Sequence, residues 1–147
     1  VITVMKFHKG RYMPHNKQKY IGDIANIIYR SSWERRFMKY CDTNSSIIEW
    51  ASEELYVPYV SPIDNKYHRY YPDFIIKVKS KKSTKIIMIE IKPSSQTKRP
   101  EKGRKKNTTY LSEMKSWAIN TSKWKHALKY CAKKNWEFKI LTEEHIL

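Results

Sequence analysis

Glycine, cysteine and acidic side chains are all scarce in this sequence. It contains three glycines and two cysteines among 147 residues. So little glycine excludes a collagen-like or low-complexity chain. The cysteines are too few and too isolated for a zinc site, and Cys41 and Cys131 each lie on the apolar stripe of an expected helix. They could pair, but two buried free thiols in a reducing compartment are the simpler interpretation.

Long apolar runs are missing as well. No segment approaches the roughly 20 residues that a membrane-spanning helix needs, and no signal-peptide pattern is present. Hydrophobic residues still make up 40% of the chain, enough for a packed core. We expect a single domain over residues 29–147 after a basic N-terminal arm over residues 1–28. In that arm, residues 1–7 could form a short strand. Residues 9–19 are expected to extend, either as a tether that reaches DNA or a protein, or as a poorly ordered end.

Acidic residues are outnumbered by basic ones. The 30 Lys and Arg against 14 Asp and Glu give a formal net charge of +16. A solvated basic surface would explain part of this excess, but its size in a small domain favours a polyanionic partner. A membrane surface is disfavoured because the chain has no lysine-rich amphipathic helix and no lipidation signal. We therefore expect DNA as the partner, without a membrane or a nucleotide cofactor.

Two β-rich runs around a polar turn predict a hairpin near the middle of the chain. The motif Tyr71-Pro72-Asp73 opens the first run, and Glu90-Ile91-Lys92 ends the second. With a symmetric turn centred between Lys81 and Lys82, the antiparallel register places Asp73 opposite Glu90. Side chains alternate along a strand, so Lys92 shares a face with Glu90. Two carboxylates and a lysine should therefore meet at one end of the hairpin.

This combination of side chains predicts metal-dependent chemistry. Carboxylates that oppose each other across a ladder destabilise it unless a cation lies between them. Hard oxygen ligands suit Mg²⁺, with Mn²⁺ able to substitute. A lysine beside such a metal can orient or deprotonate a bound water. The pattern is typical of a site that cleaves phosphodiester bonds.

The residues that form this pattern resemble the signature of the PD-(D/E)xK, or restriction-endonuclease-like, nuclease superfamily. Pro72-Asp73 is followed after sixteen residues by Glu90-x-Lys92, and Pro93 comes directly afterwards. Upstream, the segment 29–34 reads Tyr-Arg-Ser-Ser-Trp-Glu and places Glu34 on a helix. The whole arrangement resembles the head-completion nucleases of large contractile-tailed phages and, more distantly, the endonuclease subunits of Tn7-like transposons. The resemblance implies an α+β, or mixed α/β, fold with a central mixed sheet flanked by helices.

The resemblance also implies roles for individual residues. The catalytic set would be Glu34, Asp73, Glu90 and Lys92. Asp73, Glu90 and the main-chain carbonyl of Ile91 would ligate Mg²⁺, and Lys92 would position the attacking water. Glu34 would bind a second metal or orient a metal-bound water. From the residues alone, Glu34 could equally be a salt-bridged surface glutamate.

A basic loop is expected just beyond the second hairpin strand, because Pro100 and Gly103 argue against a helix there. Its position favours contact with the DNA backbone over a merely solvated charge run. The residues expected to make this contact are Lys98, Arg99, Lys102, Arg104, Lys105 and Lys106.

The remaining pattern supplies flanking elements. Ser31 or Ser32 can cap the first helix, and Asn135 can end the last one in the left-handed conformation. Glu53 and Glu54 could approach the metal, but surface charge or a cap is the preferred role. The expected elements are helices over 33–42, 110–117 and 121–134, and strands over 47–50, 55–59, 68–78 and 136–140.

The predicted function is that of a divalent-metal-dependent DNA endonuclease in phage head completion. It would trim packaged DNA in the host cytoplasm, with portal, neck or head proteins as further partners and a place in the virion left open. One alternative is the endonuclease subunit that cuts the ends of Tn7-like transposons. Another is a non-catalytic DNA-binding protein of the head–neck junction, although such a protein would have no reason to keep Asp73, Glu90 and Lys92 together.

Overall fold

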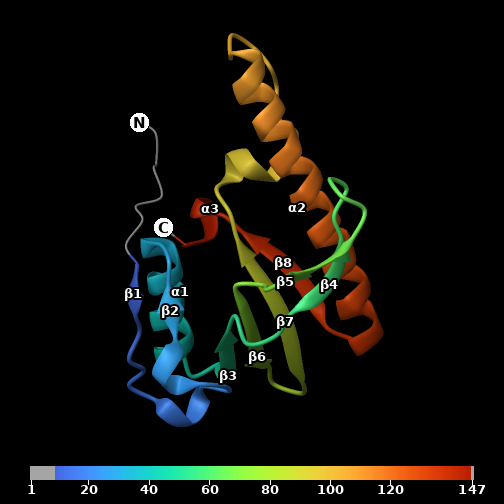
Figure 1. Cartoon of the computed structure of the whole chain (residues 1–147). Helices are drawn as coiled ribbons and strands as arrows, with labels where there is room; N and C mark the ends of the chain where they lie inside the picture. Colours follow the sequence, from blue (N-terminus) through green and yellow to red (C-terminus); the bar gives the residue numbers. More distant parts are fainter. Residues whose placement is uncertain (1–8, 147) are drawn as a thin grey trace.

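A four-stranded mixed sheet forms the centre of the computed structural model, which describes residues 9–146 (Figure 1). The sheet order is β3-β6-β7-β8, and β8 runs parallel to β7 while the other neighbours are antiparallel. Its strands are β3 (Ile47–Ser52), β6 (Phe74–Lys79), β7 (Thr84–Ile91) and β8 (Glu137–Leu141). The predicted mixed α/β fold is confirmed, whereas the strand expected over residues 1–7 lies outside the described residues.

Each face of this sheet supports its own apolar core, because side chains alternate along β7. Ile87, Ile89 and Ile91 point to one face, where α1 (Ser32–Thr43) packs through Trp33, Phe37, Met38 and Cys41. Met88 points to the other face, where α2 (Asn107–Lys134) packs through Trp124, Ala127 and Cys131. The strand is therefore buried on both sides, which explains its almost unbroken apolar sequence.

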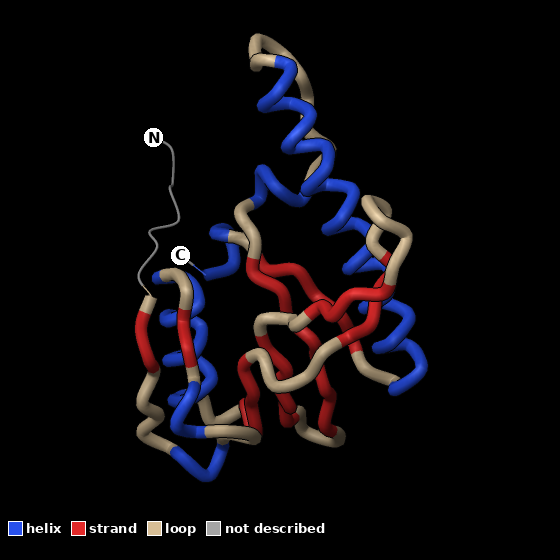
Figure 2. Tube along the Cα trace, viewed as in Figure 1, coloured by secondary structure: helices blue, strands red, loops and turns tan. Residues whose placement is uncertain are grey.

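Small elements complete the chain (Figure 2). Two further sheets have two strands each, one made by β1 and β2 and the other by β4 and β5. The bounds are β1 (Gly10–Arg11), η1 (Lys17–Lys19), η2 (Ile24–Asn26), β2 (Ile28–Tyr29), β4 (Val57–Val60), β5 (Tyr67–Tyr70), η3 (Ser94–Thr97) and α3 (Glu143–Ile146). None of the helices between residues 9 and 146 combines the length and apolar character of a membrane span.

The register of the β6–β7 hairpin is the predicted one. Ile75 pairs with Met88, and the ladder ends at Lys79–Thr84. The N–H of Ser80 donates to the carbonyl of Ser83 at 2.8 Å and closes a symmetric turn. No bulge shifts the pairing between these residues, so the position of each side chain follows directly from the turn.

Three expected elements differ from the structure. The strand predicted over 68–78 is split into β5 and β6, which belong to different sheets, because Pro72 cannot donate to a ladder and is fully buried. The strand expected over 55–59 is β4, and Pro58 lies within it, in a sheet of two strands where a missing N–H is tolerated. The prediction of two helices before Asn135 is also wrong, since α2 is continuous.

Thr121, at the expected break, bonds within α2. The hydroxyl of Thr121 donates to the carbonyls of Trp117 and Ala118 at 2.9 and 3.0 Å, so this polar residue folds back onto the helix. The two predicted helix ends are confirmed. Ser31 Oγ accepts from the N–H of Glu34 at 3.2 Å, and Asn135 adopts the left-handed conformation at φ 60°.

The described part of the N-terminal segment folds onto the domain instead of extending from it. Asp42, which is fully buried at the end of α1, accepts hydrogen bonds from this segment. Its carboxylate accepts from the hydroxyl of Tyr12 at 2.8 Å and from the N–H groups of His15 and Asn16 at 2.8 and 2.9 Å. An acidic side chain 26 to 30 residues away thus holds residues that the sequence predicts to be extended.

Replacing Asp42 with asparagine should destabilise the protein by about 3 kcal/mol, because the charged acceptor of one buried and two partly buried hydrogen bonds is lost. Burial raises the pKa of Asp42, but the bonds from His15, Asn16 and Tyr12 outweigh it and the pKa falls below its ordinary value. The carboxylate's contribution is therefore complete above about pH 4 and is lost as the pH falls below that value. Urea unfolding at pH 7 and at acidic pH measures both effects. Asp64→Asn, an exposed control, should change stability much less, and equal losses in both variants would refute this role of Asp42.

Candidate active site

Asp73 lies in the break between β5 and β6, immediately before the ladder begins. The last ladder pair is Phe74–Ile89, so Asp73 and Glu90 do not form the predicted ladder pair. Instead, the Asp73 carboxylate accepts a hydrogen bond from the N–H of Ile91 at 2.7 Å. The side chain therefore crosses to β7 and lies beside the peptide that links Glu90 to Ile91.

Glu90 and Lys92 lie on one face at the end of β7, as the alternation predicts. Lys92 Nζ is 3.9 Å from Glu90 Oε2. Glu90 is only 7% exposed. Its Oε1 is buried and has no hydrogen-bond partner among residues 9–146. A buried carboxylate oxygen without a donor is costly unless another cation or donor reaches it.

Burial dominates the electrostatics of this pair. Burial and then the Glu90 carboxylate raise the pKa of Asp73 well above its ordinary value. Burial also raises the pKa of Glu90, against the opposing effect of the Lys92 ammonium. The site thus holds two buried carboxylates whose pKa values stay raised despite the lysine beside them, which is an environment that favours a divalent cation.

Glu34 also reaches Asp73, from the first turn of α1. One carboxylate oxygen from each of Glu34, Glu53 and Asp73 lies within 4.8 Å of the others. Glu34 has a structural task too, because its carboxylate accepts from the N–H of Arg30 at 3.3 Å while Ser31 caps the helix. Burial raises the pKa of Glu34. Glu34 is half-buried and forms no ion pair among the described residues, so it differs from a salt-bridged surface glutamate, and its catalytic role stays a prediction.

Glu53 lies in the acidic cluster, although the sequence favoured a surface or capping role for it. Its backbone is left-handed at φ 52°, a strained conformation for a residue other than glycine, and its N–H donates to the Asp73 carbonyl at 3.3 Å. Both carboxylate oxygens accept from the guanidinium of Arg30 at 3.0 Å. Because Arg30 already uses both oxygens, Glu53 acts first as the residue that holds a guanidinium beside the acidic cluster.

Lys123 of α2 and Tyr70 of β5 lie next to Glu90, and neither was predicted as a site residue. The Lys123 ammonium lies 5.7 Å from the ring centroids of both Tyr59 and Tyr70. Burial lowers the pKa of Lys123, against the opposing effect of the Glu90 charge. Burial and the Glu90 carboxylate raise the pKa of Tyr70. No local pattern marks Lys123, since only packing of α2 against β4 and β5 brings it here.

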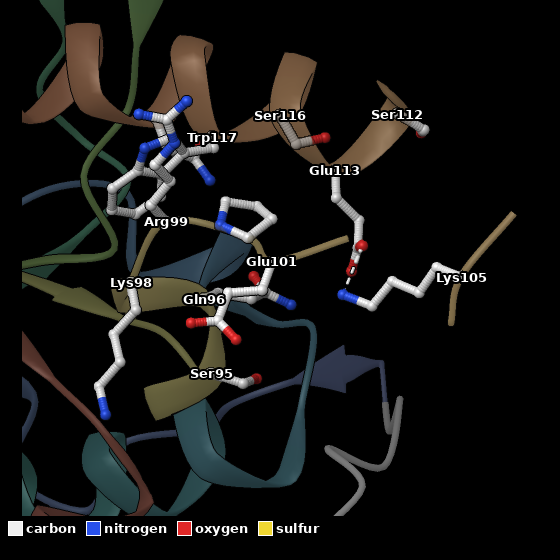
Figure 3. A pocket seen from close by; sticks show the side chains of 12 residues that line it. Ser95, Gln96, Lys98, Arg99, Glu101, Lys105, Ser112, Glu113, Ser116 and Trp117 are labelled. Carbon is white, nitrogen blue, oxygen red and sulfur yellow. Dashed lines mark ion pairs between the residues drawn. The ribbon is translucent and has the colours of Figure 1, made fainter. Parts of the chain in front are cut away.

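The basic loop of residues 98–106 follows η3 and borders a cleft against α2 (Figure 3). The cleft has a volume of about 640 Å³, and Lys98, Arg99, Lys105 and Trp117 line it. Lys105 forms an ion pair of 2.8 Å with Glu113, which fixes part of the loop to the helix. The other basic residues predicted to bind DNA, Lys102, Arg104 and Lys106, are exposed outside this lining.

The donor set fits a divalent metal. Glu90 supplies a buried oxygen without a partner, and Asp73 belongs both to the Glu90 side of the site and to the Glu34–Glu53 group. All of these donors are carboxylate oxygens, which suit a hard cation. The Ile91 peptide lies at the same place through its hydrogen bond to Asp73.

Comparisons with known proteins identify related nucleases. Residues 44–143 match the family model described as the TnsA-like endonuclease N terminal domain. Asp73, Glu90 and Lys92 lie inside this range, and Glu34 lies before it. The chain is also 37% identical over 141 residues to the head completion nuclease of Enterobacteria phage T4, and the match covers 93% of this chain and 92% of that protein.

Proposed function

This chain belongs to the family of TnsA-like endonucleases, and from that premise we propose that it cleaves DNA with Mg²⁺ during phage head completion. One observation supports the catalytic part above all others: the buried, unpartnered Oε1 of Glu90 lies in a site that also holds Asp73 and Lys92. Lys92 lies near the other oxygen, Oε2, and burial still raises the pKa of Glu90, so a further cation at Oε1 would stabilise the carboxylate. Hydrolysis of a phosphodiester bond would use all three side chains, two as metal ligands and one to position water.

Asp73 and Glu90 would hold the divalent ion, with the main-chain carbonyl of Ile91 as a further ligand. The bound ion would polarise the phosphate and lower the pKa of water. Lys92, on the same face as Glu90, would hold the attacking water and stabilise the negative charge that develops on the phosphate oxygens. Glu34 would orient a water or contribute to a second metal, and Mn²⁺ should substitute for Mg²⁺.

The assignment to head completion comes from the phage relative. That protein is named for head completion, and the match extends over nearly its whole length. By analogy, this chain would finish packaged DNA so that a filled head can accept its neck and tail. Its partners would then include portal, neck or head proteins besides DNA. It would act in the host cytoplasm, and retention in the virion would place it at the head–neck junction.

The family match favours a second candidate, an endonuclease subunit that cuts transposon ends. Such a subunit would depend on a transposase for its choice of DNA ends. Head completion is preferred because the match to the phage protein also includes most of the chain outside residues 44–143. Cleavage by the isolated protein would support the head-completion role, and strict dependence on a transposase would support the alternative.

Metal removal is the direct test of the catalytic proposal. Purified protein should nick and linearise supercoiled plasmid in Mg²⁺, and excess EDTA should stop the reaction. Adding Mg²⁺ or Mn²⁺ beyond the EDTA concentration should restore cleavage, which a gel assay measures. No cleavage with any divalent metal would favour the third interpretation, a DNA-binding protein without activity. Undiminished cleavage in EDTA would refute the metal site.

A further inference from the structure

A second basic cleft lies away from the loop of residues 98–106, between α1 and the segment that contains β1 and β2. This cleft, here called the α1 groove, has a volume of about 670 Å³. No carboxylate lines it among the described residues. Its lining includes four permanent cations and one histidine: Arg11, Arg35, Arg36, Lys39 and His15. Such a concentration of one sign predicts an anionic ligand.

The cations that α1 contributes are available for a ligand. Arg35, Arg36 and Lys39 are exposed. Within residues 9–146, none of them has a carboxylate within 4 Å. Arg35 is held in place in another way, since its guanidinium lies 5.7 Å from the ring centroid of Tyr29. Stacking of this kind orients the guanidinium without consuming its charge.

The walls of the groove are built before any ligand arrives. Asp42 fixes the segment that contains Tyr12 and His15 through the hydrogen bonds described above. On the opposite side, the ring of Tyr29 lies so close to the backbone of Gly10 that any side chain at position 10 would overlap it. The glycine at position 10 thus leaves room for the Tyr29 ring, whose centroid lies 5.7 Å from the Arg35 guanidinium. A preformed site loses less free energy on binding than a flexible one.

The α1 groove adjoins the acidic site through the first turn of α1. Tyr29 and Ser32 line the groove, whereas Arg30 and Glu34, from the same short segment, reach the acidic cluster. At 1.5 Å rise per residue, Lys39 lies only about 7.5 Å beyond Glu34 along the helix axis. Figure 1 shows β1 and β2 running alongside α1. Five residues also turn the helix through about 140°, so the groove and the acidic site lie on different sides of α1, and a DNA duplex would contact both by following the helix surface.

We propose that the α1 groove binds the phosphate backbone of substrate DNA, as a second contact separate from residues 98–106. This inference rests on the proposed DNA-cleaving function. Guanidinium groups match phosphate oxygens in a bidentate geometry, and Arg35 and Arg36 supply two of them. The groove contributes affinity and orientation but no base specificity, because the phosphate backbone carries no sequence information.

The test compares two triple variants with the same change of charge. Arg35→Gln/Arg36→Gln/Lys39→Gln neutralises the groove, and Lys125→Gln/Lys129→Gln/Lys133→Gln neutralises an exposed row on α2. Fluorescence anisotropy measures binding of a labelled duplex without divalent metal over a range of salt concentrations. The groove variant should bind about 10-fold more weakly near 0.1 M salt. The slope of log affinity against log salt concentration should become shallower by the amount that about two to three phosphate contacts contribute. The control should change far less.

Chemical acetylation of the wild type provides a readout that does not depend on a variant. Duplex DNA should protect Lys39 and leave Lys129 reactive. Equal weakening in both triple variants, or Lys39 that stays reactive in the complex, would overturn the inference. Wild-type cleavage of the same duplex is measured in parallel. Weaker binding by the groove variant without any wild-type cleavage would support the groove and refute the nuclease proposal. Wild-type cleavage with unchanged binding by the groove variant would support the nuclease proposal and refute the groove.

Discussion

Asp73→Asn should lower the rate of plasmid cleavage by about 1,000-fold or more. Asp73 is the residue that the Glu90 side of the site and the Glu34–Glu53 group have in common. Its neutralisation should therefore weaken metal binding wherever the ion is held. Asparagine can still accept the hydrogen bond from Ile91, so the fold should survive. Initial nicking rates in saturating Mg²⁺ measure the loss, and anisotropy without metal should show DNA binding that is unchanged or slightly tighter.

Asp64→Asn serves as the matched control for Asp73→Asn. Asp64 is an exposed aspartate in the turn after β4, where it accepts from Lys66 and lies near His68. The same chemical change at this position should leave cleavage unaltered. A melting curve for each variant separates loss of chemistry from loss of fold. If Asp73→Asn cleaves at the wild-type rate while folded, our assignment of the site is wrong.

Lys92→Met should lower cleavage by about 100-fold or more, because it removes the cation nearest Glu90 and keeps the length of the side chain. The Lys92 side chain is 26% exposed, so substrate can reach its ammonium. The loss should appear in the maximal rate more than in the DNA concentration at half-maximal rate, because the proposed role is in the transition state. Steady-state cleavage of a short duplex measures the two separately.

Lys77→Met provides the matched control on the same hairpin. Lys77 Nζ lies 3.7 Å from Glu49 in the β3–β6 part of the sheet, an ion pair of similar length to the Lys92–Glu90 pair but more exposed. Loss of a general sheet ion pair would affect both variants alike. The double variant Asp73→Asn/Lys92→Met should be scarcely worse than Asp73→Asn, since residues that act as a unit are not additive. Independent, multiplying losses would contradict a shared site.

The hairpin register and the Lys92–Glu90 pair were predictable because their geometry is local, whereas the expected Asp73–Glu90 ladder pair does not form because the ladder ends at Phe74–Ile89. A tight, symmetric turn sets the register of both strands, so the positions of Ile75 and Met88 follow from the sequence between them. Alternation along one strand then places Lys92 beside Glu90. The sequence offers Ser31 or Ser32 as the cap of the first helix, and the structure has Ser31 in that position. Each of these inferences needs only neighbours in the sequence.

Residues that reach the site from distant segments were not predictable in the same way. Glu53 approaches Asp73 because β3 pairs with β6 and continues to Ser52, a long-range pairing that no local pattern encodes. Lys123 borders Glu90 only because α2 packs against the β4–β5 ribbon. Asp42 likewise binds backbone groups far away in the chain. Tertiary packing decides all three, and a single sequence does not show which segments will pack together.

The 28-residue length of α2 places part of the helix where mutations do not affect the apolar cores. A helix of that length extends about 42 Å, and its buried residues Trp124, Ala127 and Cys131 all lie in its second half. Figure 1 shows the first half projecting past the sheet with residues 98–106 leading into its tip. Insertions or charge changes at this tip would disturb neither apolar core nor the carboxylates. The tip can therefore vary by mutation in length and charge while the acidic site at the end of β7 stays unchanged.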